Sequence, residues 1–236
     1  MIKKFPYIYI LCGGKGLRAR EIDKTKPKIL IEIKNKPFLY WALKNLEKKG
    51  AKNVVLCTGY KSKQIEKYIK LNKNKFKLKI HLSKEKKKLG TGGAIKFAIK
   101  NYKRDFFVMY GDTFLFYDLN KIMNFSKNNN NKSVISIYKN NDVNYRNNIF
   151  LKKNIFKYDK VNNKNFNYID YGLIYFTKKN FNYNKSKFNI TNLIESLILK
   201  KKLIPFKVKK KFLEMGSIYG YKKLIKNFEL INNELY

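Results

Sequence analysis

The feature that most restricts the fold of this chain is an apolar run that ends in a cluster of glycines near the N-terminus. Residues 8–18 read Ile-Tyr-Ile-Leu-Cys-Gly-Gly-Lys-Gly-Leu-Arg, and Pro27-Lys28 follows nine residues after Arg18. A short, continuous apolar run rich in β-formers is typical of a buried strand in a parallel sheet. Glycines directly after it let backbone N–H groups approach a polyanion without interference from Cβ atoms. The segment predicts a triphosphate-like anion site at the carboxyl end of the first strand, where Arg18 and Lys28 can add cationic side chains.

Two other interpretations of this segment compete with the anion site. Gly14 to Ala19 formally matches the dinucleotide fingerprint G-x-G-x-x-G/A. That fingerprint must open a helix, yet residues 20–27 show no sustained apolar helical period, and the acid expected about 20 residues later falls inside an apparent second strand, Leu30 to Ile33. The second alternative is an ordinary strand-to-loop turn. Three glycines with a spaced Arg and Lys favour the anion site over both.

Expected strands and helices alternate along the chain. The first half has expected helices at 37–49, around 65–69 and at 94–99, and expected strands at 54–57, 78–82 and 106–110. The second half has expected strands at 134–138, 148–151, 168–176 and 204–208, expected helices at 190–199 and 217–230, and Asn- and Lys-rich hairpins across 139–167. Strands that alternate with helices predict an α/β domain with a parallel sheet of βαβ units.

The charge of the chain is strongly positive. Its 54 Lys and Arg against 16 Asp and Glu give a formal net charge of +38, which invites a polyanion as partner. Only four of the basic residues are Arg, and Lys is spread through every segment together with abundant Asn, Ile, Tyr and Phe, which share A/T-rich codons. A dedicated nucleic-acid face concentrates its charge and favours Arg. We therefore expect no specific nucleic-acid partner, although weak, salt-sensitive polyanion binding follows from the charge.

Nothing in the sequence predicts export or a membrane crossing. The start of the chain lacks a signal-peptide pattern, and no stretch approaches 18 consecutive apolar residues. Cys12 and Cys57 fall in expected buried strands, where a cysteine is a small core residue rather than half of a disulfide. Because His81 is the one histidine of the sequence, we do not expect a Ser-His-Asp catalytic triad or a His-rich metal site. We expect a cytoplasmic protein with no membrane partner.

Three later segments would meet the first loop if the sheet is parallel. Leu89 to Ala94 is a second glycine-rich turn at a helix start, suited to reading a flat base or ribose through the backbone. Asp112, in Gly-Asp-Thr, follows directly after a buried strand, where an acid is uncommon unless it caps or coordinates. We favour a metal ligand over a cap for it. Glu214 stands in an apolar run just before a helix, and a capping role and a ligand role are equally open.

The ordered set of segments resembles the sugar-1-phosphate nucleotidyltransferases, or NDP-sugar pyrophosphorylases. Leu11 to Arg18 resembles their L-A-G-G-x-G-T-R loop, and Pro27-Lys28 resembles their P-K element. Later blocks match in order, at 36–39, 59–60, 89–94, 111–113, 168–176 and 214–217. The likeness covers nearly the whole chain and is greatest to short bacterial members that include heptose-1-phosphate and mannose-1-phosphate guanylyltransferase-like proteins.

The resemblance implies a fold and a role for each matching residue. The fold would be Rossmann-like, with three layers, a mostly parallel central sheet and a small added β-hairpin region for the sugar. One domain would span 1–236, with a nucleotide-binding half at 1–125 and a sugar-binding and C-terminal half at 126–236. By role, the site residues would be Arg18 and Lys28 for catalysis; Leu11, Cys12, Gly13, Gly14, Lys15, Gly16, Gly90, Thr91 and Gly92 for the nucleotide; Tyr171 and Gly172 for the sugar; and Asp112 and Glu214 for Mg²⁺.

The implied activity is transfer of a nucleoside monophosphate from a nucleoside triphosphate, with GTP favoured, to a sugar 1-phosphate. The products would be an NDP-sugar for glycan synthesis and pyrophosphate, and the protein would be a monomer or a homodimer. Some positions depart from the family pattern: Leu17 replaces Thr, Cys12 replaces Ala, Tyr110 stands where Asn often precedes Gly-Asp, and Glu214 replaces the commoner Asp.

Three alternatives to this activity stay open from the sequence. The chain could be a cytidylyl- or uridylyltransferase that acts on another sugar phosphate or a phosphocholine-like substrate. It could be a polyanion- or RNA-binding protein built on an α/β scaffold. It could also bind nucleotide without turnover, for which Leu17 in place of Thr is the one hint.

Overall fold

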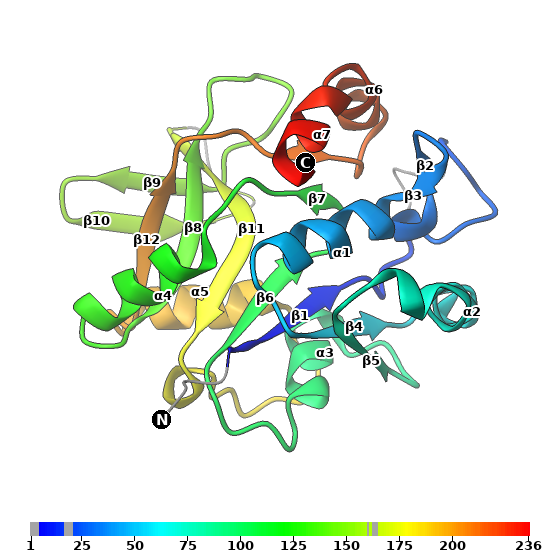
Figure 1. Cartoon of the computed structure of the whole chain (residues 1–236). Helices are drawn as coiled ribbons and strands as arrows, with labels where there is room; N and C mark the ends of the chain where they lie inside the picture. The colour runs from blue at the N-terminus through cyan, green and yellow to red at the C-terminus, as the bar shows by residue number, and fades with distance from the viewer. Residues whose placement is uncertain (1–4, 17–20, 160, 162–164) are drawn as a thin grey trace. The chain divides into compact units, whose positions relative to one another are not determined.

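The computed structural model describes residues 5–16, 21–159, 161 and 165–236 (Figure 1). The chain divides into two compact units. The first consists of residues 1–88, 109–116 and 212–236, and the second of residues 89–108 and 117–211. The division falls inside strand β6 (Phe106–Tyr110), whose last residues, Met109 and Tyr110, belong to the first unit.

The first unit is built on three parallel strands, which lie side by side in Figure 1: β1 (Tyr7–Leu11), β4 (Asn53–Thr58) and β5 (Lys79–Lys84). The strand order is β6-β1-β4-β5, and β1 and β4 run in register from Ile8 opposite Val54 to Leu11 opposite Cys57. The interior strands β1 and β4 are largely buried because their sequences are mostly apolar, whereas the outermost strand β5 has only exposed and half-buried residues.

Helices and short strand pairs complete the first unit. The helices are α1 (Phe38–Lys48), α2 (Ser62–Asn72), α6 (Ile218–Lys226) and α7 (Phe228–Leu235), with 3-10 turns η2 (Lys28–Leu30) and η3 (Lys73–Lys75). The short antiparallel pairs are β2 (Glu32–Ile33) with β3 (Lys36–Pro37) and β7 (Thr113–Phe114) with β13 (Leu213–Glu214).

Helix α1 anchors two loops of the first unit through buried polar side chains. The indole Nε1 of Trp41 donates to the carbonyl of Ile33 at 2.9 Å, and its ring meets Phe228 of α7 edge to face with ring centroids 5.0 Å apart. The Asn45 amide donates to the carbonyl of Leu115 at 2.8 Å, and Asn45 is 1% exposed. Because buried polar groups are costly unless they are paired, these bonds fix the loops that follow β2 and β7.

The second unit combines antiparallel and parallel strands. Its strands are β8 (Ser133–Lys139), β9 (Ile149–Lys152), β10 (Ile155–Tyr158), β11 (Tyr168–Phe176) and β12 (Leu203–Val208), and its helices are α3 (Gly90–Ala98), α4 (Leu119–Asn128) and α5 (Ile190–Leu199), with a 3-10 turn, η4 (Lys178–Asn180). Strand β11 pairs antiparallel with β8 and β9, β9 and β10 form a hairpin, and β8 and β12 run parallel.

The α/β class and Rossmann-like architecture predicted from the sequence are confirmed, and most expected elements match the observed ones within one or two residues. Two expectations need correction. The apparent strand Leu30 to Ile33 is a strand only at Glu32–Ile33, because Leu30 ends the 3-10 turn η2, in which the carbonyl of Pro27 accepts the N–H of Leu30 at 2.8 Å. The terminal helix expected at 217–230 is two helices, which meet at Asn227 with φ −105° and ψ 28°. Helix α4 was not expected at all.

Within the described ranges, none of the helices combines the length and apolar character that a membrane crossing needs. Cys12 and Cys57 are free thiols, as expected from the sequence. His81 lies on the exposed strand β5 and stacks on the ring of Tyr7, with centroids 6.0 Å apart.

Gly111 gives a test of how closely β6 and β1 approach. Its N–H donates to the carbonyl of Leu11 at 3.0 Å, and a Cβ at this position would lie 2.6 Å from the same oxygen. We expect Gly111→Ala to lower the free energy of unfolding by about 1–3 kcal/mol, because only backbone movement can relieve the overlap. Gly14→Ala is the matched control, since a Cβ there meets nothing within 4 Å. Equal stability of the two variants in urea unfolding would contradict this packing.

Candidate active site

The glycine loop leaves β1 along a path that is fixed by backbone hydrogen bonds to the end of β4. The N–H of Cys12 donates to the carbonyl of Cys57 at 3.0 Å, and the carbonyl of Gly13 accepts the N–H of Tyr60 at 3.0 Å. A Cβ on Gly13 would lie 3.1 Å from the backbone nitrogen of Gly59, so the two backbones are in close contact here. The loop is therefore held at the carboxyl end of the parallel strands, where α/β sheets bind ligands.

A basic pocket lies next to this loop. Its lining residues are Lys15, Gly16, Asp23, Lys24, Lys26, Lys28, Ile31 and Tyr60. Gly16 has a left-handed φ of +58°, and the space where its Cβ would stand lies 3.3 Å from the side chain of Lys28. Among the described lining residues, four lysines against one acid give the pocket a positive potential, which suits phosphate oxygens.

The far wall of the basic pocket is a turn that Asp23 organises. Its carboxylate accepts hydrogen bonds from the N–H of Thr25 at 2.7 Å, the hydroxyl of Thr25 at 2.6 Å and the N–H of Lys26 at 3.1 Å. These bonds, led by the Thr25 hydroxyl, lower the pKa of Asp23. The ammonium of Lys61 donates to the carbonyls of Lys24 and Thr25 at 2.7 and 2.8 Å, which ties the turn to the start of α2.

Lys28 and Asp112 meet at the edge of this pocket, although 84 residues separate them. The ammonium of Lys28 lies 2.7 Å from Oδ2 of Asp112, and the two side chains are 19% and 29% exposed. Lys28 starts the 3-10 turn after Pro27, and Asp112 stands between β6 and β7. A cation and a carboxylate from distant segments thus share one half-buried position at the carboxyl end of the sheet.

Glu214 lies beside Asp112 because it belongs to the two-residue strand β13, which pairs with β7. In the β13–β7 pair Glu214 stands opposite Thr113, and the N–H of Met215 donates to the carbonyl of Asp112 at 2.9 Å. The carboxylate of Glu214 is buried. Its Oε1 accepts the hydroxyl of Ser217 at 2.6 Å, and its Oε2 accepts the N–H of Gly216. Burial raises the pKa of Glu214, and the nearby charge of Asp112 adds to this, while both hydrogen bonds oppose it.

Gly216 shows how close these charged groups are. A Cβ built on Gly216 would lie 2.8 Å from Oε2 of Glu214, 3.0 Å from Oδ2 of Asp112 and 3.3 Å from Nζ of Lys28. Two carboxylate oxygens therefore converge on one small space next to a lysine. In the described part of the chain no group of three or more His, Cys, Asp or Glu side chains could hold a metal ion. Two carboxylates nevertheless match Mg²⁺, which commonly takes one or two and completes its shell with phosphate oxygens and water.

The other site residues expected from the sequence lie in the second unit. At the start of α3, the N–H groups of Gly92 and Gly93 donate to the carbonyl of Phe188 at 3.0 and 3.1 Å, and the hydroxyl of Thr91 accepts the N–H of Ile190 at 2.9 Å. A Cβ on Gly90 would lie 2.5 Å from the carbonyl oxygen of Phe188. Close packing of the start of α3 against the 188–190 segment thus explains why glycines stand there. Their contact with a nucleotide stays a prediction.

Tyr171 and Gly172 lie in an irregular part of β11, where the pairing with β8 shifts between Asp170 and Ile174. Tyr171 is fully buried, and Gly172 has a left-handed φ of +86°. The buried carboxylate of Asp170 accepts the N–H of Gly172 at 2.9 Å and the hydroxyl of Tyr158 at 3.2 Å. Asp170 therefore fixes the bulge that presents Gly172.

Comparisons with known proteins identify the family to which this chain belongs. A family model described as nucleotidyl transferase matches residues 8–145, which include the glycine loop, Lys28 and Asp112. The chain belongs to this nucleotidyl transferase family. It is 42% identical over 134 residues to a D-glycero-alpha-D-manno-heptose 1-phosphate guanylyltransferase of Campylobacter jejuni, and 41% identical over 115 residues to one of Aneurinibacillus thermoaerophilus. These matches cover 56% and 48% of this chain and 58% and 49% of those proteins.

Solved structures extend the likeness to most of the chain. A crystal structure of HddC from Yersinia pseudotuberculosis is 28% identical, with a TM-score of 0.80, and the match covers 95% of this chain and 100% of that one. Another structure of HddC is a complex with GMP-PN. The inositol-1-phosphate CTP transferase of T. maritima, at 17% identity and a TM-score of 0.79, shares the fold.

Two residues of the family pattern are not among those the structure describes, and some residues of the site were not expected. Arg18 and Leu17 lie outside the described residues. The sequence did not indicate a role for Lys24 and Lys26 of the basic pocket or for Ser217, which bonds to Glu214. The Asp-x-Thr spacing that begins at Asp23 is a turn signal that could have located the pocket.

The thiol of Cys12 provides a test of the loop in this nucleotidyltransferase. Its Sγ lies 3.3 Å from the carbonyl of Cys57, and burial raises the pKa of Cys12 well above its ordinary value and that of Cys57 to about 12. A free thiol with a pKa of about 8.5 is partly ionised at pH 8 and reacts as the thiolate. We expect both cysteines to react with iodoacetamide at pH 8 at least roughly ten times more slowly in the native protein than in urea. Rapid labelling of Cys12 in the native state would show that the loop is more open.

Proposed function

We propose that this chain transfers a nucleoside monophosphate from a nucleoside triphosphate, with GTP favoured, to a sugar 1-phosphate, releasing an NDP-sugar and pyrophosphate. The observation that carries the proposal is the meeting of Lys28, Asp112 and Glu214 beside the glycine loop and the basic pocket. The preference for GTP and for a heptose or mannose 1-phosphate rests on relatives named guanylyltransferases and on the HddC complex with GMP-PN. A cytoplasmic location, where nucleoside triphosphates are made, belongs to the same proposal.

The chemistry needs no nucleophile from the protein. A phosphate oxygen of the sugar 1-phosphate attacks the α-phosphorus in line, forming one P–O bond as the bond to the bridging oxygen of the leaving pyrophosphate breaks. The protein contributes position and charge, because several anionic groups must be held together. The backbone of residues 11–16 would hold the nucleotide, and the lysines of the basic pocket would neutralise its phosphates.

Lys28 has a central place in this proposal because its ammonium can serve two partners. It pairs with Asp112 and also lines the basic pocket, so a short movement of its side chain exchanges the carboxylate for phosphate oxygens. Arg18, which follows the last glycine of the loop, would add a second cation. The two cations together would balance the charge that grows on the leaving pyrophosphate.

Asp112 and Glu214 would hold Mg²⁺, which fits their paired hard oxygens at the Gly216 space. When bound, Mg²⁺ neutralises phosphate charge and aligns phosphate oxygens. Glu214 would reach its ionised form more readily in that state, since an adjacent cation offsets the cost of burying the carboxylate. Gly172, with the buried Tyr171 behind it, would lie against the sugar, and Gly90, Thr91 and Gly92 would contact the nucleotide.

The direct test incubates the protein with each of four nucleoside triphosphates, Mg²⁺ and a panel of sugar 1-phosphates while pyrophosphate is measured. We expect release with GTP and a heptose or mannose 1-phosphate. Release with CTP or UTP instead would move the assignment to cytidylyl or uridylyl transfer. Silence in all combinations would overturn the proposal and favour binding alone. If nucleotide binding then collapsed steeply between 50 and 200 mM salt, as nonspecific polyanion binding does, a polyanion-binding protein would be favoured.

Replacing Lys28 tests the role of the shared cation. We expect Lys28→Ala to lower turnover on the order of 10²–10³-fold, by analogy with the loss of a transition-state donor, and we expect a similar loss for Arg18→Ala. Lys63→Ala, a change of an exposed lysine on α2, is the matched control and should leave turnover unchanged. Initial rates at saturating substrates give the comparison. Near-normal rates for Lys28→Ala would show that the ammonium does not act on the phosphates.

A further inference from the structure

The carboxylate of Glu214 occupies the surface of helix α6 at Gly220. A Cβ built on Gly220 would overlap Oε1 and Cδ of Glu214 and would lie 2.8 Å from the Glu214 carbonyl oxygen. Gly220 is buried, and the position is helical. A glycine destabilises a helix relative to alanine, so a structural reason must favour it here. The reason is space, because the side chain of Glu214 fills the volume that any other residue at 220 would take.

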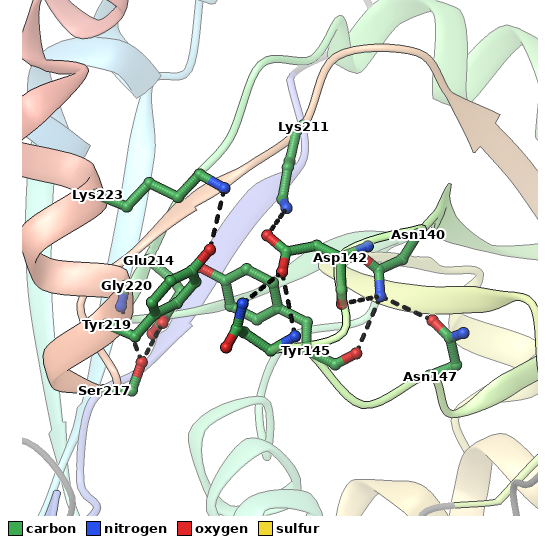
Figure 2. A network of polar contacts seen from close by, with 11 residues as sticks. Asn140, Asp142, Tyr145, Asn147, Lys211, Glu214, Ser217, Tyr219, Gly220 and Lys223 are labelled. Carbon is green, nitrogen blue, oxygen red and sulfur yellow. Dashed lines mark hydrogen bonds and ion pairs between the residues drawn. The ribbon is translucent and has the colours of Figure 1, made fainter.

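Ser217 joins these two residues through one hydroxyl group. As the N-cap of α6 it accepts the N–H of Gly220 at 3.0 Å, and it donates to Oε1 of Glu214 at 2.6 Å. Figure 2 shows the Ser217 side chain bonded to Glu214 at the start of this helix, with Gly220 labelled alongside. The Glu214 side chain is thus folded back over the first turn of α6, and this is the conformation in which Oε2 lies at the Gly216 space with Asp112 and Lys28.

We propose that Gly220 is a positioning residue of the site: by presenting no Cβ, it lets the long side chain of Glu214 fold over α6 and place Oε2 beside Asp112. The metal-binding consequence rests on the proposed function, while the steric part rests on geometry alone. A methyl group at 220 pushes the Glu214 carboxylate away from Asp112. Aspartate at 214 is one methylene shorter and does not reach the Gly220 surface in the same way, so residues 214 and 220 are coupled.

The test is a double-mutant cycle over Glu214→Asp and Gly220→Ala, with Lys222→Ala on the exposed side of α6 as the control. In EDTA we expect Gly220→Ala alone to lower Tm by roughly 3–8 °C, despite the better helix propensity of alanine. In the Glu214→Asp background the same change should cost less than half of that, and a residual loss is expected because the Glu214 backbone oxygen stays close. The control should leave Tm unchanged.

Metal dependence gives the second readout. With the substrates that support turnover, we expect Gly220→Ala to raise the Mg²⁺ concentration for half-maximal rate on the order of 10-fold, as for residues that orient metal ligands. The value for the double variant should lie within about threefold of that for Glu214→Asp alone, which a residue with a merely structural role would not produce.

The outcomes separate this inference from the proposed function. Equal losses of Tm in the two backgrounds would overturn the coupling, as would failure of both Gly220→Ala proteins to fold. Folding of the double variant when Gly220→Ala alone does not fold would support it. If the wild-type protein released no pyrophosphate with any substrate, the unfolding cycle in EDTA would still decide the steric coupling while the proposed function failed.

Discussion

A strand pair of two residues on each side is the constraint on which the candidate site depends. The pairing of β13 with β7 sets Glu214 opposite Thr113, next to Asp112, although about a hundred residues separate the two acids in the chain. Leu11 of β1 accepts the N–H of Gly111 on the other flank of this turn, and Asn45 of α1 holds the carbonyl of Leu115. These bonds hold the two carboxylates together against the repulsion between like charges and against the cost of burying Glu214.

The candidate site brings acids and lysines together, and the large positive net charge of the whole chain does not reveal this local arrangement. Lysines are abundant everywhere, but those around Gly16 line one pocket, and one of them, Lys28, pairs with Asp112. Two acids and several cations at the carboxyl end of a parallel sheet suit a reaction between polyanions, in which phosphates must be neutralised and a divalent cation held.

A different polar network lies in the second unit. Lys211 pairs with Asp142 at 2.8 Å, and Asn140 bonds to the 142–147 loop (Figure 2). These contacts stabilise that loop.

Much of the fold and of the candidate site could be predicted from the sequence, because many of their features depend on residues that are neighbours in the chain. The apolar runs of β1, β4 and β6, the glycines after β1 and the acid after β6 are each visible in a few neighbouring residues. The pairing of β7 with β13 could not be predicted in this way, since its two strands lie about a hundred residues apart in the chain. The same holds for Gly220, whose reason is a side chain from another segment. Glu214 bonds to Ser217, which is the N-cap of α6, and it also lies beside Asp112; its role as a metal ligand stays a prediction.

The most direct measurement is a crystal structure of the protein with Mn²⁺ in place of Mg²⁺ and a non-hydrolysable GTP analogue, using the anomalous signal of manganese. The account predicts one metal peak between the carboxylates of Asp112 and Glu214, with the Lys28 ammonium moved from Asp112 to phosphate oxygens. A nucleotide bound with its phosphates away from residues 11–16, or a metal held without either acid while the Lys28–Asp112 ion pair stays closed, would contradict it.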